Sequence, residues 1–253
     1  MASVTSDPTR RLRMVVAYDG SDFHGFALQP GVTTVAGAIC AALERALRHT
    51  VELTCAGRTD AGVHAWGQVI NFEARYDAEP VALQRALNKA LRPAIVIRES
   101  CVAEDGFDAR RSATGRRYHY TIRNDPVADP FTARTAWHVT ERLDLPAMRL
   151  ACDPLIGEHD FSAFCRRPPG EGSLIRKVRD ARWVDLSDSM LRFEIEASSF
   201  CHQMVRSIVG MMVEIGIGKK RAGDVAQILR SRSRQGAGQL APPHGLCLWE
   251  VTY

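Results

Sequence analysis

The stretch CAGRTDAGVHAW, residues 55–66, places a guanidinium, a hydroxyl, a carboxylate and an imidazole within the seven positions 58–64. A short apolar run precedes it, and residues 69–73 alternate between apolar and polar types as a half-buried strand does. Gly57 and Gly62 bound the polar residues. We therefore expect a loop between two strands with Asp60 at its tip, and functional side chains usually lie on such loops.

The neighbours of Asp60 alone allow several interpretations. An aspartate between glycines commonly forms an Asx turn, in which its carboxylate accepts backbone N–H groups just ahead of it. A phosphate-binding loop has less support, because no Gly-x-x-x-x-Gly-Lys pattern follows here. A metal pair of Asp60 and His64 is also weakly supported, since a third ligand nearby is missing from the sequence.

The residues around this loop predict an α+β unit. Hydrophobic periodicity indicates strands at 12–18, 51–53, 69–73 and 95–97, and helices at 35–48 and 81–91. Thr34 is placed to cap the first helix, and Pro80 is placed to open the second. The order strand, helix, two strands, helix, strand is that of a ferredoxin-like unit.

The second half repeats this mixture. Strands are expected at 118–122, 176–186, 191–197 and 249–253, and helices at 145–155, 200–216 and 222–229. We expect a disordered tail at 1–10, a first subdomain at 11–105 that carries the loop, and a second at 106–253. The predicted fold is α+β, with two ferredoxin-like halves sharing a mixed, mainly antiparallel sheet and helices on one side.

Composition narrows the class of protein. A hydrophobic fraction of 45% and a charged fraction of 25% are typical of globular domains, and no apolar run is long enough to span a membrane. The first ten residues lack the apolar core of a secretion signal, so we expect a cytoplasmic protein. The seven cysteines are scattered without a Cys-x-x-Cys pair, which predicts reduced thiols rather than disulfides or structural zinc.

The basic residues are almost all arginine, since only four are lysine. Arg110, Arg111, Arg116 and Arg117 precede the alternating strand that begins at Tyr118. A run of this kind is commonly a solvated edge of a sheet. The alternative is a basic groove with aromatic platforms, as in proteins that hold unpaired nucleotides.

Residues 200–216 form the clearest helical pattern, with apolar side chains recurring along one stripe. Arg206 falls almost opposite that stripe, which on its own predicts a solvated arginine. Gly210, one turn further along, would let another part of the chain approach the same face closely.

Residues 57–65, GRTDAGVHA, resemble the signature loop of the TruA family of tRNA pseudouridine synthases, whose aspartate is the catalytic residue. Segments resembling other family motifs follow the family order, at 18–26, 118–122, 200–210 and 241–248. One position departs from the pattern: Ala27 stands where the family commonly has glutamine, and Gln29 comes two residues later.

The resemblance implies a function and a role for each motif residue. The family isomerises uridine to pseudouridine at positions 38, 39 and 40 of the tRNA anticodon stem-loop, as a homodimer, with RNA in a cleft between the halves and without a cofactor or metal. By resemblance Asp60 is the nucleophile or base, and Arg58 supports the flipped-out nucleotide. Tyr118 stacks on the uracil, Leu246 lines its pocket, and Arg206 pairs with the catalytic aspartate.

Two other classes of function compete with this one. A non-catalytic RNA-binding module would keep the arginines and aromatic residues but would not need Asp60. A zinc-dependent nucleobase deaminase would need a His or Cys-x-x-Cys ligand set with a glutamate general acid, which the sequence lacks.

Overall fold

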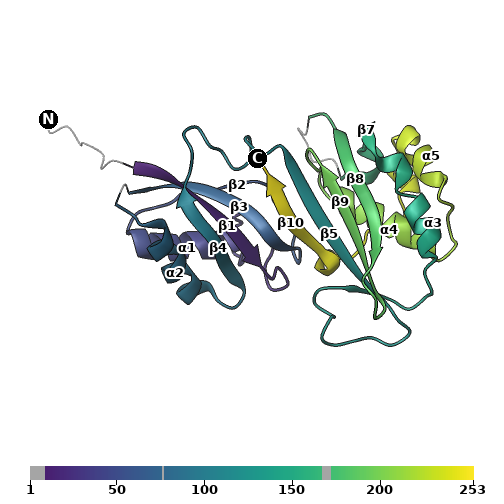
Figure 1. Cartoon of the computed structure of the whole chain (residues 1–253), viewed down its shortest axis with the longest axis horizontal. Helices are drawn as coiled ribbons and strands as arrows, with labels where there is room; N and C mark the ends of the chain where they lie inside the picture. Colours follow the sequence, from purple (N-terminus) through teal and green to yellow (C-terminus); the bar gives the residue numbers. More distant parts are fainter. Residues whose placement is uncertain (1–8, 76, 167–171) are drawn as a thin grey trace. The chain divides into compact units, whose positions relative to one another are not determined.

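The computed structural model describes residues 9–75, 77–166 and 172–253 (Figure 1). The chain divides into two compact units after Ala113, and the C-terminal Tyr253 belongs to the first unit. The expected tail at 1–10 lies largely outside the described residues. Its last two residues, Thr9 and Arg10, are the first residues of a strand.

The first unit is a ferredoxin-like unit, as its sequence predicted. Its elements are β1 (Thr9–Tyr18), α1 (Val35–Leu47), β2 (Thr54–Cys55), β3 (His64–Arg75), α2 (Pro80–Leu91) and β4 (Ile95–Val102). The strands pair antiparallel in the order β4-β1-β3-β2. The strand expected at 51–53 begins later, at Thr54 of β2. Val51 is buried, but its carbonyl accepts from the Cys40 thiol of α1.

The core of this unit lies between its helices and one face of its sheet. Leu12, Met14 and Val16 of β1 alternate onto that face and are fully buried. Ile70 of β3 lies opposite Met14 in the strand register and completes the apolar layer. α1 and α2 contact each other beside the strands, as Figure 1 shows.

The segment after β4 folds back onto the first unit. The Arg11 guanidinium donates to the carbonyl of Phe107 at 2.7 Å, and the Ala109 N–H donates to the buried Asn71 side chain at 2.7 Å. The Tyr253 hydroxyl donates to the Ala109 carbonyl at 2.9 Å. These contacts place residues 106–113 with the first unit.

The second unit has the same strand order with additions at its edges. Its strands and helices are β5 (Gly115–Asn124), β6 (Trp137–Val139), α3 (Leu145–Leu150), β7 (Gly157–Asp160), β8 (Ile175–Asp185), β9 (Met190–Ala197), α4 (Met204–Gly216), α5 (Asp224–Ser231) and β10 (Leu246–Thr252). The antiparallel order β10-β5-β9-β8 is again ferredoxin-like, β7 extends it, and β6 pairs parallel to β5. The helix expected at 145–155 ends at Leu150, and a 3₁₀ turn containing Pro154 follows.

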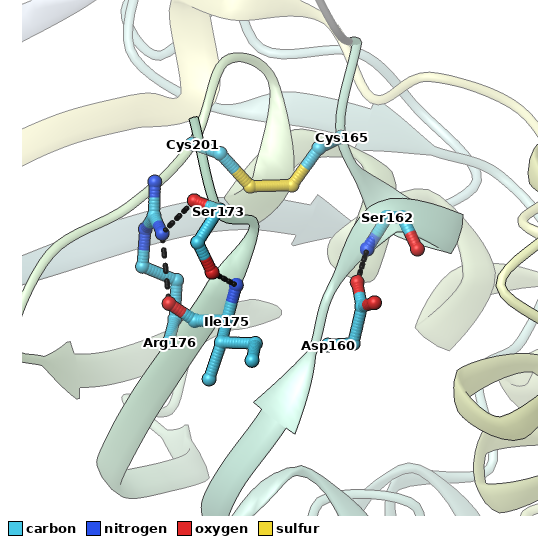
Figure 2. The surroundings of a disulfide bond; sticks show 7 residues. All are labelled: Asp160, Ser162, Cys165, Ser173, Ile175, Arg176 and Cys201. Carbon is cyan, nitrogen blue, oxygen red and sulfur yellow. Dashed lines mark hydrogen bonds between the residues drawn. A yellow bond between two sulfur atoms is a disulfide. The ribbon is translucent and has the colours of Figure 1, made fainter. Parts of the chain in front are cut away.

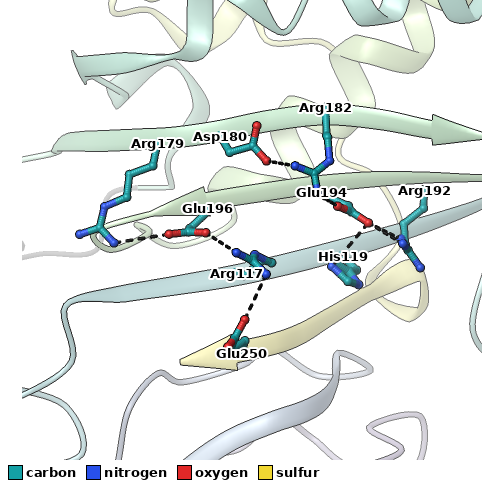
Figure 3. Close-up of polar contacts among 9 residues, drawn as sticks. All are labelled: Arg117, His119, Arg179, Asp180, Arg182, Arg192, Glu194, Glu196 and Glu250. Carbon is teal, nitrogen blue, oxygen red and sulfur yellow. Dashed lines mark hydrogen bonds and ion pairs between the residues drawn. The ribbon is translucent and has the colours of Figure 1, made fainter. Parts of the chain in front are cut away.

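The two faces of this sheet differ in chemistry. Tyr118, Tyr120 and Ile122 of β5 lie on one face, whereas the intervening His119 and Thr121 lie on the other, which also carries charged residues. On the charged face Glu194 binds Arg182 and Arg192, and Glu196 binds Arg117 and Arg179, as Figure 3 shows. His119 lies under this network, stacked on Trp249 with ring centroids 4.4 Å apart.

The buried imidazole makes stability depend on pH. Burial lowers the pKa of His119 from 6.5 to about 4, against the opposing effect of Glu194. Between these values the unfolded chain binds a proton that the folded chain does not, so stability must fall as the solution is acidified. We expect the unfolding free energy to drop by about 1–2 kcal/mol more in the wild type than in His119→Phe between pH 7 and pH 5. Equal losses in denaturant titrations of the two proteins would contradict this assignment.

A disulfide joins Cys165 and Cys201, whose Cα atoms lie 5.8 Å apart (Figure 2). Both residues are buried, and the Arg166 N–H donates to the His202 carbonyl beside the bond. The expectation that every cysteine is a reduced thiol is therefore wrong for this pair. Cysteines 36 residues apart gave no sign of being neighbours, because only the fold brings their two segments together.

Candidate functional site

Asp60 lies in the loop between β2 and β3, as predicted. Its side chain is half-buried, Arg58 is exposed, and Thr59 between them is buried. The Val63 N–H donates to the Asp60 carbonyl at 3.1 Å, which closes a tight turn. Gly62 takes a positive φ of 77° within that turn, a conformation that other residues adopt at a cost.

The turn after β1 clasps this loop from one side. The Phe26 N–H donates to the Thr59 carbonyl at 3.1 Å, and the Gly62 N–H donates to the Phe23 carbonyl at 3.3 Å. Gly25 has a φ of 88°, and a Cβ there would lie 2.9 Å from the Thr59 carbonyl oxygen. A Cβ on Gly20 would overlap the backbone of Val63. The glycines of 18–26 thus let two backbones meet.

Side chains hold the loop at two further places. The Gln68 amide of β3 pairs with both peptide groups of Gly57, and the Tyr18 hydroxyl lies 2.7 Å from the Thr59 hydroxyl. The Gly20 N–H donates to Nδ1 of the buried His64 at 3.0 Å. The sequence alone did not single out Tyr18 and Gln68. A polar residue at the centre of an apolar strand was the available signal for Gln68.

Position 27 departs from the family pattern, and Gln29 two residues later does not take over the place of the missing glutamine side chain in sequence. Ala27 is half-buried, and the exposed Gln29 side chain donates to the carbonyl of His24 at 2.8 Å. Gln29 therefore braces its own turn.

Positive charge gathers near the base of the loop. Burial raises the pKa of the Cys55 thiol, and the guanidiniums of Arg58 and Arg110 oppose that rise. Both arginines therefore lie close enough to Cys55 to act on it. The backbone N–H groups of Arg111 and Arg110 donate to the Asp108 carboxylate, and the Arg111 bond is the main cause of its lowered pKa. This part of the first unit is suited to binding phosphate.

The aromatic and apolar candidates lie together in the second unit. Tyr118 of β5 is buried on the face of the sheet that carries the apolar residues, and its ring meets Phe200 edge-on at 5.0 Å. Leu246 begins β10 opposite Tyr120, and Leu248 lies opposite Tyr118. Leu246 is therefore two residues away from the partner of Tyr118, on the same face of the sheet. The Tyr120 hydroxyl donates to the Pro242 carbonyl at 2.8 Å and fixes the approach to Leu246.

Arg206 is not the solvated arginine that its helix position alone predicted. Its Nε donates to the Ala241 carbonyl at 2.8 Å, and the Ala241 N–H returns a bond to the Arg206 carbonyl. A Cβ on Gly210 would overlap the Gln239 carbonyl, so residues 239–241 lie directly on this face of α4. The close approach expected from Gly210 is confirmed. The segment that leads to Leu246 is thereby tied to Arg206.

The four arginines predicted for an RNA groove are divided between the two units. Arg110 and Arg111 belong to the first unit. Arg116 is buried on the Tyr118 side of β5 and donates to the Ser198 carbonyl at 3.0 Å. Arg117 points to the opposite face, where Glu196 and Glu250 bind its guanidinium (Figure 3). Arg116 and Arg117 are consecutive residues of β5, so their side chains lie on opposite faces of the sheet.

Within the described ranges, no cluster of three or more His, Cys, Asp or Glu side chains is arranged to hold a metal ion. In the same part of the chain, none of the helices has both the length and the apolar character needed to span a bilayer.

Comparison with known proteins gives a consistent picture. The profile of a family described as tRNA pseudouridine synthase matches residues 14–110 and 151–253. The tRNA pseudouridine synthase A of Brevibacillus brevis is 41% identical over 244 residues, which cover 96% of this chain and 100% of that protein. The proteins of the same name from an Exiguobacterium species and Bacillus subtilis are 38% and 36% identical, again over 96% of this chain and 98% and 99% of theirs. The similarity spans both units, including the loop of Asp60.

Proposed function

Because this chain belongs to the tRNA pseudouridine synthase family, we propose that it isomerises uridines 38, 39 and 40 of the tRNA anticodon stem-loop, with Asp60 as the catalytic nucleophile. Membership of the family establishes formation of pseudouridine in tRNA. The modified positions 38, 39 and 40 and the roles of the individual residues are what we propose.

One observation carries the assignment of Asp60. The loop from Gly57 to His64 is held at five points by backbone and side-chain contacts, while its carboxylate-bearing residue remains half-buried at the tip. A reacting group must be held close to its productive geometry, and a loop fixed in this way supplies that. An aspartate that only stabilised a turn would not need so many contacts around it.

The reaction needs few groups because it is an isomerisation. The N1–C1′ glycosidic bond breaks, the uracil rotates while bound, and C5 forms a new bond to C1′, so no atom is gained or lost. A uridine within a stem must first leave the base stack, at a cost of a few kcal/mol. Arg58 supports the flipped-out state, Tyr118 stacks on the uracil, Leu246 lines its pocket and Arg206 supplies positive charge beside the nucleotide.

The proposal is tested with transcripts of one tRNA that carry a single uridine at position 38, 39 or 40, and with one that carries none. We expect purified protein to form one pseudouridine in each of the first three and none at these positions in the fourth. Formation only at a site outside the anticodon stem-loop would overturn the proposed position while leaving the family activity intact.

The arginines make a separate prediction about affinity. Each phosphate contact contributes about 0.7–0.9 to the slope of log affinity against log salt concentration. If Arg110 and Arg111 contact phosphate, we expect their double alanine variant to bind tRNA more weakly and to lower that slope by about 1.4–1.8. Filter binding at several salt concentrations measures it. Arg117→Ala is the matched control, because Glu196 and Glu250 already bind its guanidinium, and we expect it to leave the slope unchanged. A slope unaltered in the double variant would return Arg110 and Arg111 to the solvated interpretation.

We propose in addition that the chain acts as a homodimer in the cytoplasm, where its tRNA substrate is found. Light scattering should then give twice the 28.0 kDa mass of one chain. Disulfides are rare in the cytosol, so the Cys165–Cys201 bond is the observation that stands against this compartment. Alkylation of thiols in freshly lysed cells would report its state there.

A further inference from the structure

Two buried polar side chains of the sheet contact the loop on either side of Arg58. Gln68 of β3 is fully buried; its Nε2 donates to the Gly57 carbonyl at 2.6 Å, and its Oε1 accepts the Gly57 N–H at 3.3 Å. Tyr18, at the end of β1, is 4% exposed, and its hydroxyl lies 2.7 Å from that of Thr59, which is 7% exposed. Thr59 directly precedes Asp60.

Both side chains come from inner strands of the first unit. β1 and β3 are the two inner strands of the order β4-β1-β3-β2, and Gln68 lies opposite Val16 in their register. A buried amide among apolar side chains is unfavourable unless its hydrogen bonds are satisfied, and an aliphatic residue would pack there at lower cost. Here the loop satisfies the amide, so the Gln68 side chain serves to hold Gly57 in place.

We propose that Tyr18 and Gln68 are positioning residues for the isomerisation, fixing Arg58 and Asp60 against the sheet. This inference rests on the proposed role of Asp60 in catalysis. Gln68 fixes the peptide bond between Gly57 and Arg58, and Tyr18 fixes Thr59, which lies between Arg58 and Asp60. A loop released at either place keeps its charges but loses the alignment of its carboxylate, and a misplacement of about 1 Å can slow a reaction by about 10²-fold.

The alternative is that these contacts stabilise the fold and nothing more. The two ideas differ in what they predict for a well-folded variant. A structural role lowers the unfolding free energy and leaves the chemical step unchanged. A positioning role lowers the single-turnover rate at saturating enzyme while the Kd for tRNA stays constant, because affinity comes mainly from phosphate contacts.

The test uses substitutions that keep shape. Tyr18→Phe and Thr59→Val each remove one hydroxyl, and we expect either to slow single-turnover pseudouridine formation by about 10- to 100-fold with Kd within twofold of wild type. Thr59→Ser retains the hydroxyl, and its rate should stay within about threefold of wild type. The double variant Tyr18→Phe, Thr59→Val should be no slower than the slower single one, because both singles break the same contact.

Gln68→Met tests the second contact, and the chain supplies a matched control. The Asn88 side chain of α2 makes the same two-point contact with the peptide groups of Ile97, at 2.9 and 2.7 Å, away from the loop. Asn88→Leu should cost stability yet react at the wild-type rate, whereas Gln68→Met should be slow. If Gln68→Met does not fold, the Tyr18→Phe result decides alone.

The outcomes separate this inference from the proposed function. Tyr18→Phe reacting at the wild-type rate while Asp60→Asn is inactive would overturn the inference and leave the function standing. Equal rate losses in Gln68→Met and Asn88→Leu would also overturn it, since general destabilisation would explain both. Asp60→Asn remaining active would overturn the proposed catalytic role itself.

Discussion

We expect Asp60→Asn and Asp60→Ala to abolish pseudouridine formation, a loss of at least about 10⁴-fold in single-turnover rate. The reason is that the carboxylate takes part in breaking and remaking the glycosidic bond, and neither an amide nor a methyl group can replace it. Contacts of Gly57, Thr59 and Gly62 anchor the loop around Asp60, so both variants should fold. The measurement is the amount of pseudouridine formed with enzyme in excess over tRNA.

Affinity should behave differently in these variants. Binding is expected to depend on arginine–phosphate contacts, so the Kd for tRNA should stay within a few-fold of wild type. Asp105→Asn, in an exposed loop of the same unit, is the control for loss of one negative charge and should retain full activity. A variant that lost tRNA binding as well as turnover would show that Asp60 acts in recognition or folding.

The second large effect is expected from Gly210→Ala. Alanine normally stabilises a helix interior relative to glycine by about 1 kcal/mol. Here the added Cβ would overlap the Gln239 carbonyl, and a backbone segment cannot move aside as a flexible side chain can. We therefore expect a net destabilisation of about 2–3 kcal/mol in denaturant titrations.

Activity should fall in the same variant, because the displaced segment includes Ala241, which Arg206 binds, and leads into Leu246. Gly223→Ala is the matched control. Its φ of −64° suits alanine, and a Cβ there meets nothing within 4 Å, so stability should stay equal or rise by up to about 1 kcal/mol. Equal stabilities for Gly210→Ala and Gly223→Ala would show that residues 239–241 do not pack on α4 as described.

Features with a local cause could be predicted from the sequence. The alternation of residues 191–197 and the apolar stripe of α4 each appear where expected, because burial of one face leaves a period in the sequence. The start of α4 at Met204 was missed because Gln203 takes a left-handed conformation with a φ of 64°. β6 has three residues, which is too short for any period to show.

Features that depend on distant segments could not be predicted in this way. Arg206 faced away from the apolar stripe, and nothing in its helix indicated that residues 239–241 would cover it. Gln68 shows its use only once the fold brings Gly57 beside β3. The same holds for Cys165 and Cys201. The resemblance to a family singled out Asp60, whereas the contacts that hold its loop came from the structure.

The proposal that this chain forms pseudouridine in the anticodon stem-loop through Asp60 can be tested in cells. Its most direct test is to map pseudouridine in tRNA from cells that lack the gene and carry either the wild-type chain or Asp60→Ala at equal abundance. We expect pseudouridine at positions 38, 39 and 40 with the wild-type chain and unmodified uridine there with Asp60→Ala. Pseudouridine at those positions in the Asp60→Ala cells, or its absence in the wild-type cells, would contradict this proposal.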